Sequence, residues 1–410
     1  MSRTRLPGAG TLRRGAAACG LLIACILGVV AAASAAESQQ RTPQAARLLL
    51  GIEDNAQMLG NGVGVLPDIQ ALHPKVFRFT IFWSSVARRR PSVARNSDDK
   101  AYNWSQVDAV AKQISALGIP LLFTIVATPA WAGGGSKNVK APKKLVDLQN
   151  FAYAAAARYN GKHLDAAGAT LPKVVRWEAW NEPNLQTHLM PQWTAVGTKK
   201  QPLRPFCFGK SWIPASPGIY RGILNAIYKG VHAAGKAARL TEQVAGGATA
   251  PYGRGPCAVV PGFAPLAFLR DLVEKPVSVD AWSHHPYRNA RQNAKPFTGD
   301  NVDVQGMSRL YTALTKAFHG RRVPVWVTEF GAQTNPPDRY QGVPLSQQSA
   351  QLRQAVAAFK KSGRVQLMIW FLVRDEDIAG RSFAAGFQSG LAYYSGKRKP
   401  AFSVFQSLAK

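Results

Sequence analysis

Two glutamates at the ends of apolar, β-branched runs carry the clearest chemical signal in the sequence. Glu182 is the sixth residue of WEAWNEPN, residues 177–184, and a proline follows it. Glu329 lies near the end of VPVWVTEFG, residues 323–331, and is 147 positions further on. Taken alone, a strand-ending glutamate is more often an ordinary surface residue. Two in these contexts instead predict a pair of carboxyl groups that act as acid, base or nucleophile.

The elements that position this pair follow a regular alternation. Short apolar or β-branched runs recur, and each is followed by a Gly/Pro-rich stretch and then an Ala- and Leu-rich segment with helical spacing. The predicted strands are residues 48–52, 76–82, 120–126, 174–180, 244–248, 278–283, 323–327 and 365–371. An open doubly wound sheet would alternate in the same way, but no G-x-G-x-x-G follows the first run. Eight units favour the α/β class and a closed (β/α)8 TIM barrel.

In such a barrel the chemistry gathers at the C-terminal ends of the strands. The spacing between Glu182 and Glu329 fits three β/α units, which places them after the fourth and seventh strands. The longest loop-rich insertions, residues 185–217 and 250–265, follow the fourth and fifth strands. We therefore expect residues 37–410 to form a single catalytic domain with elaborated loops on the active face.

The sequence is similar to clan A glycoside hydrolases of the family 39 or family 5 type, across essentially all of residues 37–410. The similarity lies in the Asn-Glu-Pro of strand four and the glutamate that ends strand seven, with further matches at Arg78, His285-Pro286-Tyr287 and Trp370. Residues 128–132, Thr-Pro-Ala-Trp-Ala, favour family 39. The resemblance implies a retaining hydrolase of β-type O-glycosidic bonds in a polysaccharide or oligosaccharide. Glu182 would be its acid/base and Glu329 its nucleophile, and a covalent glycosyl-enzyme intermediate would form.

The resemblance also implies a supporting shell around the two glutamates. Arg78 and Tyr287 would hold Glu329 ionised and oriented, and Asn181 would bind the 2-hydroxyl of the sugar. The negative charge of Glu329 is expected to raise the pKa of Glu182. Arg78 taken alone could equally be a buried ion-pair partner. His285 is preferred to His284 because it begins the matching His-Pro-Tyr.

Substrate contacts are expected from side chains near the strand ends: Trp370 as the floor of the sugar subsite, with Trp83, Trp131 and Asp54. Four further tryptophans, Trp177, Trp180, Trp282 and Trp326, lie inside strands and are expected in the core. We predict no cofactor and no metal, because the adjacent His284 and His285 point to opposite faces of a strand and cannot readily bind one ion.

The two long insertions carry one cysteine each, Cys207 and Cys257. A bridge between them would join two loops of the active face, and two buried free thiols are the alternative. Residues 1–36 have the layout of a signal peptide, with arginines, an apolar run and a small-residue end. An uncleaved membrane anchor or a lipoprotein leader are the other interpretations. Each implies a secreted or cell-surface protein.

The formal net charge of +29 is suited to an anionic partner, such as an anionic polysaccharide. Arg88, Arg89, Arg90 and Arg374 would lie on the active face, but the basic residues are scattered and a generally basic surface explains them equally well. Nothing resembles a nucleic-acid module, and we expect a monomer. The competing hypothesis is a non-catalytic carbohydrate- or cell-wall-binding barrel.

Overall fold

The structure is a computed structural model in which residues 48–196, 205–288, 295–378 and 386–410 are described. Arg47–Lys410 form one compact unit. The predicted leader, residues 1–36, lies outside the described residues. Within them, no helix is long and apolar enough to cross a membrane.

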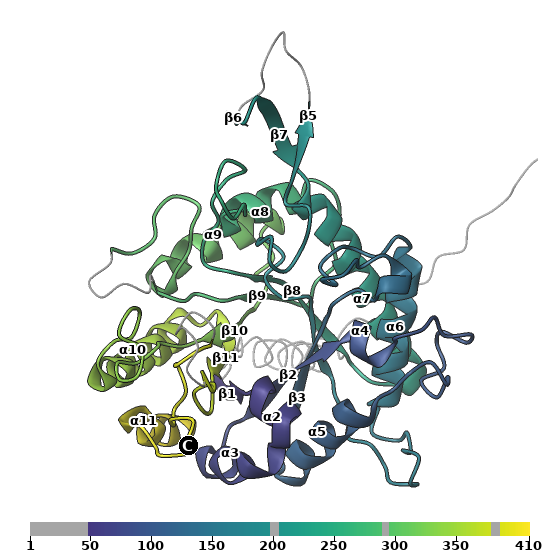
Figure 1. The fold of residues 1–410 in the computed structure, drawn as a ribbon, viewed down its shortest axis with the longest axis horizontal. Coiled ribbons are helices and arrows are strands. Elements are labelled where there is room, and N and C mark those ends of the chain that lie inside the picture. Colours follow the sequence, from purple (N-terminus) through teal and green to yellow (C-terminus); the bar gives the residue numbers. More distant parts are fainter. Residues whose placement is uncertain (1–47, 197–204, 289–294, 379–385) are drawn as a thin grey trace, which may run out of the picture. The chain divides into compact units, whose positions relative to one another are not determined.

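Eight parallel strands close into a barrel, which confirms the predicted fold (Figure 1). The order around the barrel is β1-β2-β3-β4-β8-β9-β10-β11, and β11 pairs with β1 to close it. The strands are β1 (Leu49–Glu53), β2 (Val76–Phe82), β3 (Leu121–Val126), β4 (Arg176–Ala179), β8 (Gln243–Thr249), β9 (Ala281–His284), β10 (Val325–Phe330) and β11 (Val365–Phe371). Each predicted run contains or overlaps one of them.

Helices follow every strand and surround the barrel in Figure 1. They are α2 (Asn55–Asn61), α3 (Leu66–Leu72), α4 (Trp83–Val86), α5 (Ser105–Ala116), α6 (Leu145–Arg158), α7 (Ser216–Ala238), α8 (Pro265–Leu272), α9 (Met307–Ala317), α10 (Leu345–Ser362) and α11 (Pro400–Ala409). Each long helix buries an apolar stripe against the barrel, as Ile223, Ile227 and Val231 do on α7.

The core lies between the strands and the helices, and a smaller apolar cluster fills the barrel interior. Trp177, Trp180, Trp282 and Trp326 are at most 1% exposed, as expected for core residues. β4 ends earlier than predicted because Trp180 leaves the extended conformation, with φ of 71°. The indole of Trp180 donates to the carbonyl of His188, so the bend also ties down the loop after β4.

The insertion after β4 forms a small antiparallel sheet of its own. It contains β5 (Trp193–Val196), β6 (Phe206–Cys207) and β7 (Lys210–Pro214), in the order β5-β7-β6. Figure 1 shows it at the top, outside the ring of helices. A disulfide joins Cys207 to Cys257 in the loop after β8, as predicted. Two chain segments of the active face are thereby held together.

Candidate active site

A cavity of about 1480 Å³ opens at the C-terminal ends of the strands, and both Glu182 and Glu329 line it. Glu182 comes from the loop after β4, where its backbone N–H donates to the carbonyl of Ala248. Glu329 is the penultimate residue of β10. An oxygen of Glu182 and an oxygen of Glu329 lie within 4.8 Å of each other. The barrel therefore brings the two predicted catalytic groups together.

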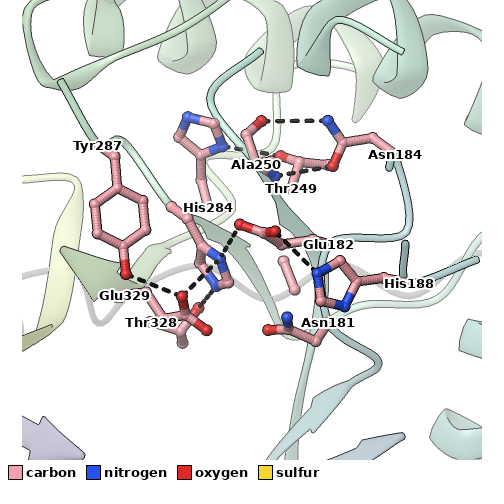
Figure 2. A network of polar contacts seen from close by, with 12 residues as sticks. Asn181, Glu182, Asn184, His188, Thr249, Ala250, His284, Tyr287, Thr328 and Glu329 are labelled. Carbon is pink, nitrogen blue, oxygen red and sulfur yellow. Dashed lines mark hydrogen bonds and ion pairs between the residues drawn. The ribbon is translucent and has the colours of Figure 1, made fainter. Parts of the chain in front are cut away.

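Two histidines contact Glu182. Nδ1 of His285 lies 3.1 Å from Oε1 of Glu182, and Nε2 of His188 lies 3.3 Å from Oε2. Figure 2 shows His188 on the far side of Glu182 from Glu329 and Tyr287. Burial raises the pKa of Glu182, but the contacts with the two histidines lower it more, so the net shift is downward. The expected upward shift from Glu329 is therefore outweighed in this site.

His285 is fully buried between the two glutamates. Its Nδ1 is 3.5 Å from Oε2 of Glu329 as well as 3.1 Å from Glu182, and its Nε2 is 3.1 Å from Oγ1 of Thr328. Burial lowers the pKa of His285, but the charges of Glu329 and Glu182 raise it more, so the net pKa is raised. The geometry therefore favours a proton on His285 and a carboxylate on Glu182.

Glu329 is held from two sides. Nη1 of Arg78 donates to its Oε1 over 2.8 Å. The hydroxyl of Tyr287 donates to its Oε2 over 3.0 Å (Figure 2). Nη2 of Arg78 also donates to Oδ1 of Asn181 over 2.9 Å. The structure thus assembles Arg78, Asn181, His285 and Tyr287 around the two glutamates.

A cation could be held by Glu182, His285 and Glu329, which form the one cluster of possible metal ligands among the described residues. His284 does not belong to it. Its Nδ1 lies 2.8 Å from Oγ1 of Thr249 and its Nε2 lies 2.9 Å from the carbonyl of Val302. The two adjacent histidines do have separate environments, as the strand alternation predicts.

None of the four residues that were expected to contact the substrate lines the cavity. Trp370 is fully buried and its indole donates to the carbonyl of Ser389, because β11 turns this side chain into the layer between barrel and helices. Trp83 packs against Trp131 and Phe151, and the indole of Trp131 donates to the carbonyl of Ala87. None of these tryptophans lines the cavity.

Asp54 is also outside the cavity. Its carboxylate caps α2 by accepting from the N–H of Gln57, and it accepts from the N–H of Arg374. Strand alternation explains the correction, because Glu53, one residue earlier, points into the barrel and pairs in register with Arg78. Arg374 itself binds Asp68, and Arg88, Arg89 and Arg90 do not line the cavity.

Several cavity residues escaped the sequence interpretation. Glu53 belongs to a strand end whose neighbour was chosen instead, and His188 lies in a loop without a motif. The aromatic side chains that line the cavity include Phe82, Tyr252, Tyr340, Phe371 and Phe387. Phe371 follows Trp370 directly, so the sequence predicts the correct strand end but not which of its residues faces the cavity.

One segment of the chain that contributes to this site matches a family model. Residues 274–390 match the family model described as glycosyl hydrolase catalytic core, a segment that carries His285, Tyr287 and Glu329. No curated protein sequence matches the chain.

Solved structures share the fold at low identity. A glucosidase from Croceicoccus marinus is 16% identical with a TM-score of 0.59, covering 89% of this chain and 67% of that one. A family 39 glycoside hydrolase from Bacteroides cellulosilyticus is 15% identical with a TM-score of 0.57, covering 89% and 64%. A β-glucosidase from Pyrococcus furiosus is 12% identical with a TM-score of 0.53, covering 88% and 94%. This chain thus spans about two thirds of the first two. The match over residues 274–390 agrees with the expected resemblance to glycoside hydrolases, and the solved structures share the barrel fold.

Proposed function

Because the chain carries a glycosyl hydrolase catalytic core on a closed (β/α)8 barrel, we propose that it is a retaining glycoside hydrolase. Glu329 is the nucleophile and Glu182 the acid/base. The observation that carries the proposal is the approach of their oxygens to within 4.8 Å. Retaining enzymes separate the two carboxyl groups by roughly 5 to 5.5 Å, whereas inverting enzymes leave room for a water at roughly 6.5 to 9.5 Å.

In the first step Glu329 attacks the anomeric carbon while a proton reaches the leaving oxygen. Glu182 is ionised in the free site, so the proton comes from the pair that it forms with His285. Transfer from Nδ1 of His285 to Oε1 of Glu182 spans 3.1 Å, and Glu182 passes the proton on. The bond to the leaving oxygen breaks as the bond to Glu329 forms.

In the second step Glu182 acts as base on a water molecule, which attacks the anomeric carbon and releases Glu329. Formation of the covalent ester removes the charge of Glu329, which is one of the charges that favour a proton on His285. Arg78 and Tyr287 hold the carboxylate before attack and receive it after release. Asn181 accepts from Arg78 through Oδ1, which leaves its amide nitrogen to bind the sugar 2-hydroxyl.

The test is a screen of activated aryl glycosides and polysaccharides with the native protein, Glu182→Ala and Glu329→Ala. The exposed Glu274 supplies a matched control, Glu274→Ala. We expect Glu329→Ala to lose at least about 10⁴-fold in kcat/KM, and Glu182→Ala to retain activity selectively on substrates whose leaving group needs no proton. Equal activity in all four proteins would refute the enzyme and favour a non-catalytic carbohydrate-binding barrel. Inverted product stereochemistry would refute the retaining mechanism.

The substrate is proposed to be a β-linked polysaccharide or oligosaccharide with anionic groups. Lys137, Arg254 and Arg288 line the cavity, and none has an ion-pair partner among the described residues. The opposing acid at the rim is Glu376. Hydrolysis of acidic polymers should therefore fall steeply as salt rises from low to physiological concentration, since exposed charges are screened over about 10 Å at 0.1 M. Equal rates at low and high salt would contradict the anionic substrate.

Export is part of the same proposal. The Cys207–Cys257 disulfide supports an oxidising compartment, in agreement with the predicted leader. A secreted or cell-surface glycosidase would meet polymeric substrates outside the cell.

A further inference from the structure

A third carboxyl group, that of Glu53, lies beside the proposed nucleophile. Glu53 ends β1, is 3% exposed and lines the cavity. Its Oε2 accepts a hydrogen bond from Nη1 of Arg78 over 2.5 Å, and Oε1 of Glu329 accepts from the same nitrogen over 2.8 Å. The two carboxyl groups therefore share one guanidinium nitrogen.

The guanidinium of Arg78 also contacts a further carboxyl group, that of Glu178, through its other terminal nitrogen. Oε2 of Glu178 lies 2.7 Å from Nη2 of Arg78 and accepts a hydrogen bond from Oγ1 of Thr124 over 2.7 Å. Glu178 is fully buried and does not line the cavity. Three buried carboxyl groups thus surround a single guanidinium. Burying like charges without matching counter-charges is costly, so a cluster of this kind is expected to keep a proton.

The hydrogen bonds indicate which carboxyl group keeps the proton. Glu329 accepts from Tyr287 in addition to Arg78, and Glu178 accepts from Thr124 in addition to Arg78. In the described part of the chain, the hydrogen-bond partner of Glu53 is Arg78 alone. Burial raises the pKa of Glu53 to about 8, with the charge of Glu329 adding to the rise and Arg78 opposing it. The contacts of Glu178 lower its pKa despite burial.

Charged groups on several neighbouring elements surround Glu53. On β11, its register partner is the uncharged Phe371. The charged or titratable groups nearby are Arg78 on β2, Glu329 on β10, His285 and Tyr287 after β9 and, through Arg78, Glu178 on β4. Arg78 and protonated His285 are the cations of this set. They face Glu178, Glu182 and Glu329, so an ionised Glu53 would add an unmatched negative charge.

We propose that Glu53 is a positioning residue that carries a proton in the resting site and thereby leaves Nη1 of Arg78 to Glu329. This deepens the glycosidase function proposed above and rests on it. When Glu53 loses the proton, a second carboxylate competes with Glu329 for Nη1 of Arg78. The added attraction draws Arg78 toward β1 and weakens the contact that orients Glu329. Activity therefore falls on the alkaline side as Glu53 ionises.

The kinetic test is the pH profile of kcat/KM for Glu53→Gln, since an amide resembles the protonated carboxyl group and cannot ionise. We expect up to about tenfold loss near neutral pH and a shift of the alkaline limb to higher pH by about one unit. An unshifted pH profile would mean that Glu53 only holds Arg78 in place and that its ionisation does not control activity. A shift to lower pH would assign the limb to the pair of Glu182 and His285, because removing a nearby negative charge lowers their pKa values. Either result overturns the proposal.

Glu242→Gln is the matched control. Glu242 is 3% exposed, burial raises its pKa to about 7, and its Oε2 accepts from the indole of Trp177 outside the cavity. Its amide variant should leave the pH profile in place. Thermal unfolding of both variants distinguishes a loss of folding from a change in titration.

Infrared difference spectroscopy separates this proposal from the proposed function, because it needs no substrate. Between about pH 6 and about pH 10 the native protein should lose the protonated-carboxyl absorption of its buried acids, including Glu53 and Glu242. The band that is missing in Glu53→Gln and kept in Glu242→Gln belongs to Glu53. If the band is assigned to Glu53 and no glycoside is cleaved by the native protein, the glycosidase function fails while the protonation of Glu53 stands. If Glu53→Gln leaves the band unchanged, the proposal is wrong.

Discussion

The strand ends and the rim of the same cavity are built in different ways. At the strand ends, Arg78 and His285 are at most 1% exposed, and each makes hydrogen bonds to residues of other strands or of the loops that follow them. At the rim, Tyr340 is 80% exposed, Phe387 50% and Phe82 39%. The first group is fixed by the register of the barrel, whereas Tyr340 and Phe387 are carried by loops and Phe82 is the last residue of β2.

We therefore expect the buried strand-end residues to affect the reaction and the exposed rim residues to affect substrate binding. A buried polar cluster tolerates little change, because each removed partner leaves an unmatched charge behind. An exposed aromatic ring mainly contributes contact area, so its removal affects binding and leaves the fold nearly unchanged. Substitutions in the two regions should therefore differ both in size and in what they change.

The largest effect is expected from Arg78→Gln. It leaves Glu53, Glu178 and Glu329 without their shared cation, so we expect at least about 10³-fold loss in kcat/KM and a free energy of unfolding lower by about 3 to 5 kcal/mol. Arg90→Gln is the control, because Arg90 pairs with Asp147 at the surface. More than a tenth of native activity in Arg78→Gln would show that the cluster is dispensable.

Replacing the disulfide affects the rim loops more than the strand ends. In the double variant Cys207→Ser and Cys257→Ser, we expect the free energy of unfolding to fall by about 2 to 4 kcal/mol. Hydrolysis of small aryl glycosides should stay within about threefold, because neither cysteine lines the cavity. Denaturant unfolding and steady-state kinetics measure the two quantities. A large loss of kcat with unchanged stability would instead show that these loops take part in the catalytic step.

Trp370→Phe tests a residue that was expected to contact the sugar but is fully buried. It removes the hydrogen bond to Ser389 and leaves a small void, so the expected cost in stability is about 1 to 3 kcal/mol, with KM within about twofold of native. A several-fold rise in KM at native stability would instead restore Trp370 as a sugar contact.

The smallest effect is expected from Phe387→Ala at the rim. Phe387 packs edge-on against Phe371, with ring centroids 5.1 Å apart, and is otherwise half exposed. We expect KM for oligosaccharides to rise about fivefold and the free energy of unfolding to change by less than about 1 kcal/mol. Unchanged KM for every oligosaccharide would remove this ring from the substrate site.

Much of the fold was accessible from periodicity. Each of the eight predicted runs contains or overlaps a barrel strand, because buried parallel strands are apolar throughout and glycine commonly marks the helix ends between them. The boundary at Trp180 was not accessible, since the left-handed turn there depends on the hydrogen bond of its indole to the loop. The disulfide partners could be predicted because the sequence left two cysteines on two neighbouring loops.

The choice between adjacent residues at a strand end required the structure. Asp54 and Trp370 were expected in the cavity, and their neighbours Glu53 and Phe371 lie there instead. Successive side chains point to opposite faces of a strand, so an error of one position exchanges a cavity residue for a buried one. Motifs gave no help at β1, where no family pattern singled out a residue.

The sequence by itself predicted the barrel from local periodicity, and its resemblance to glycoside hydrolases identified the two glutamates and the residues of their supporting shell. Only the tertiary structure decided the protonation pattern. The pKa of Glu182 depends on His188 and His285, and that of Glu53 on burial, Arg78 and Glu329. These groups are brought together by closure of the barrel, and electrostatic coupling depends on distance in space rather than on distance along the chain.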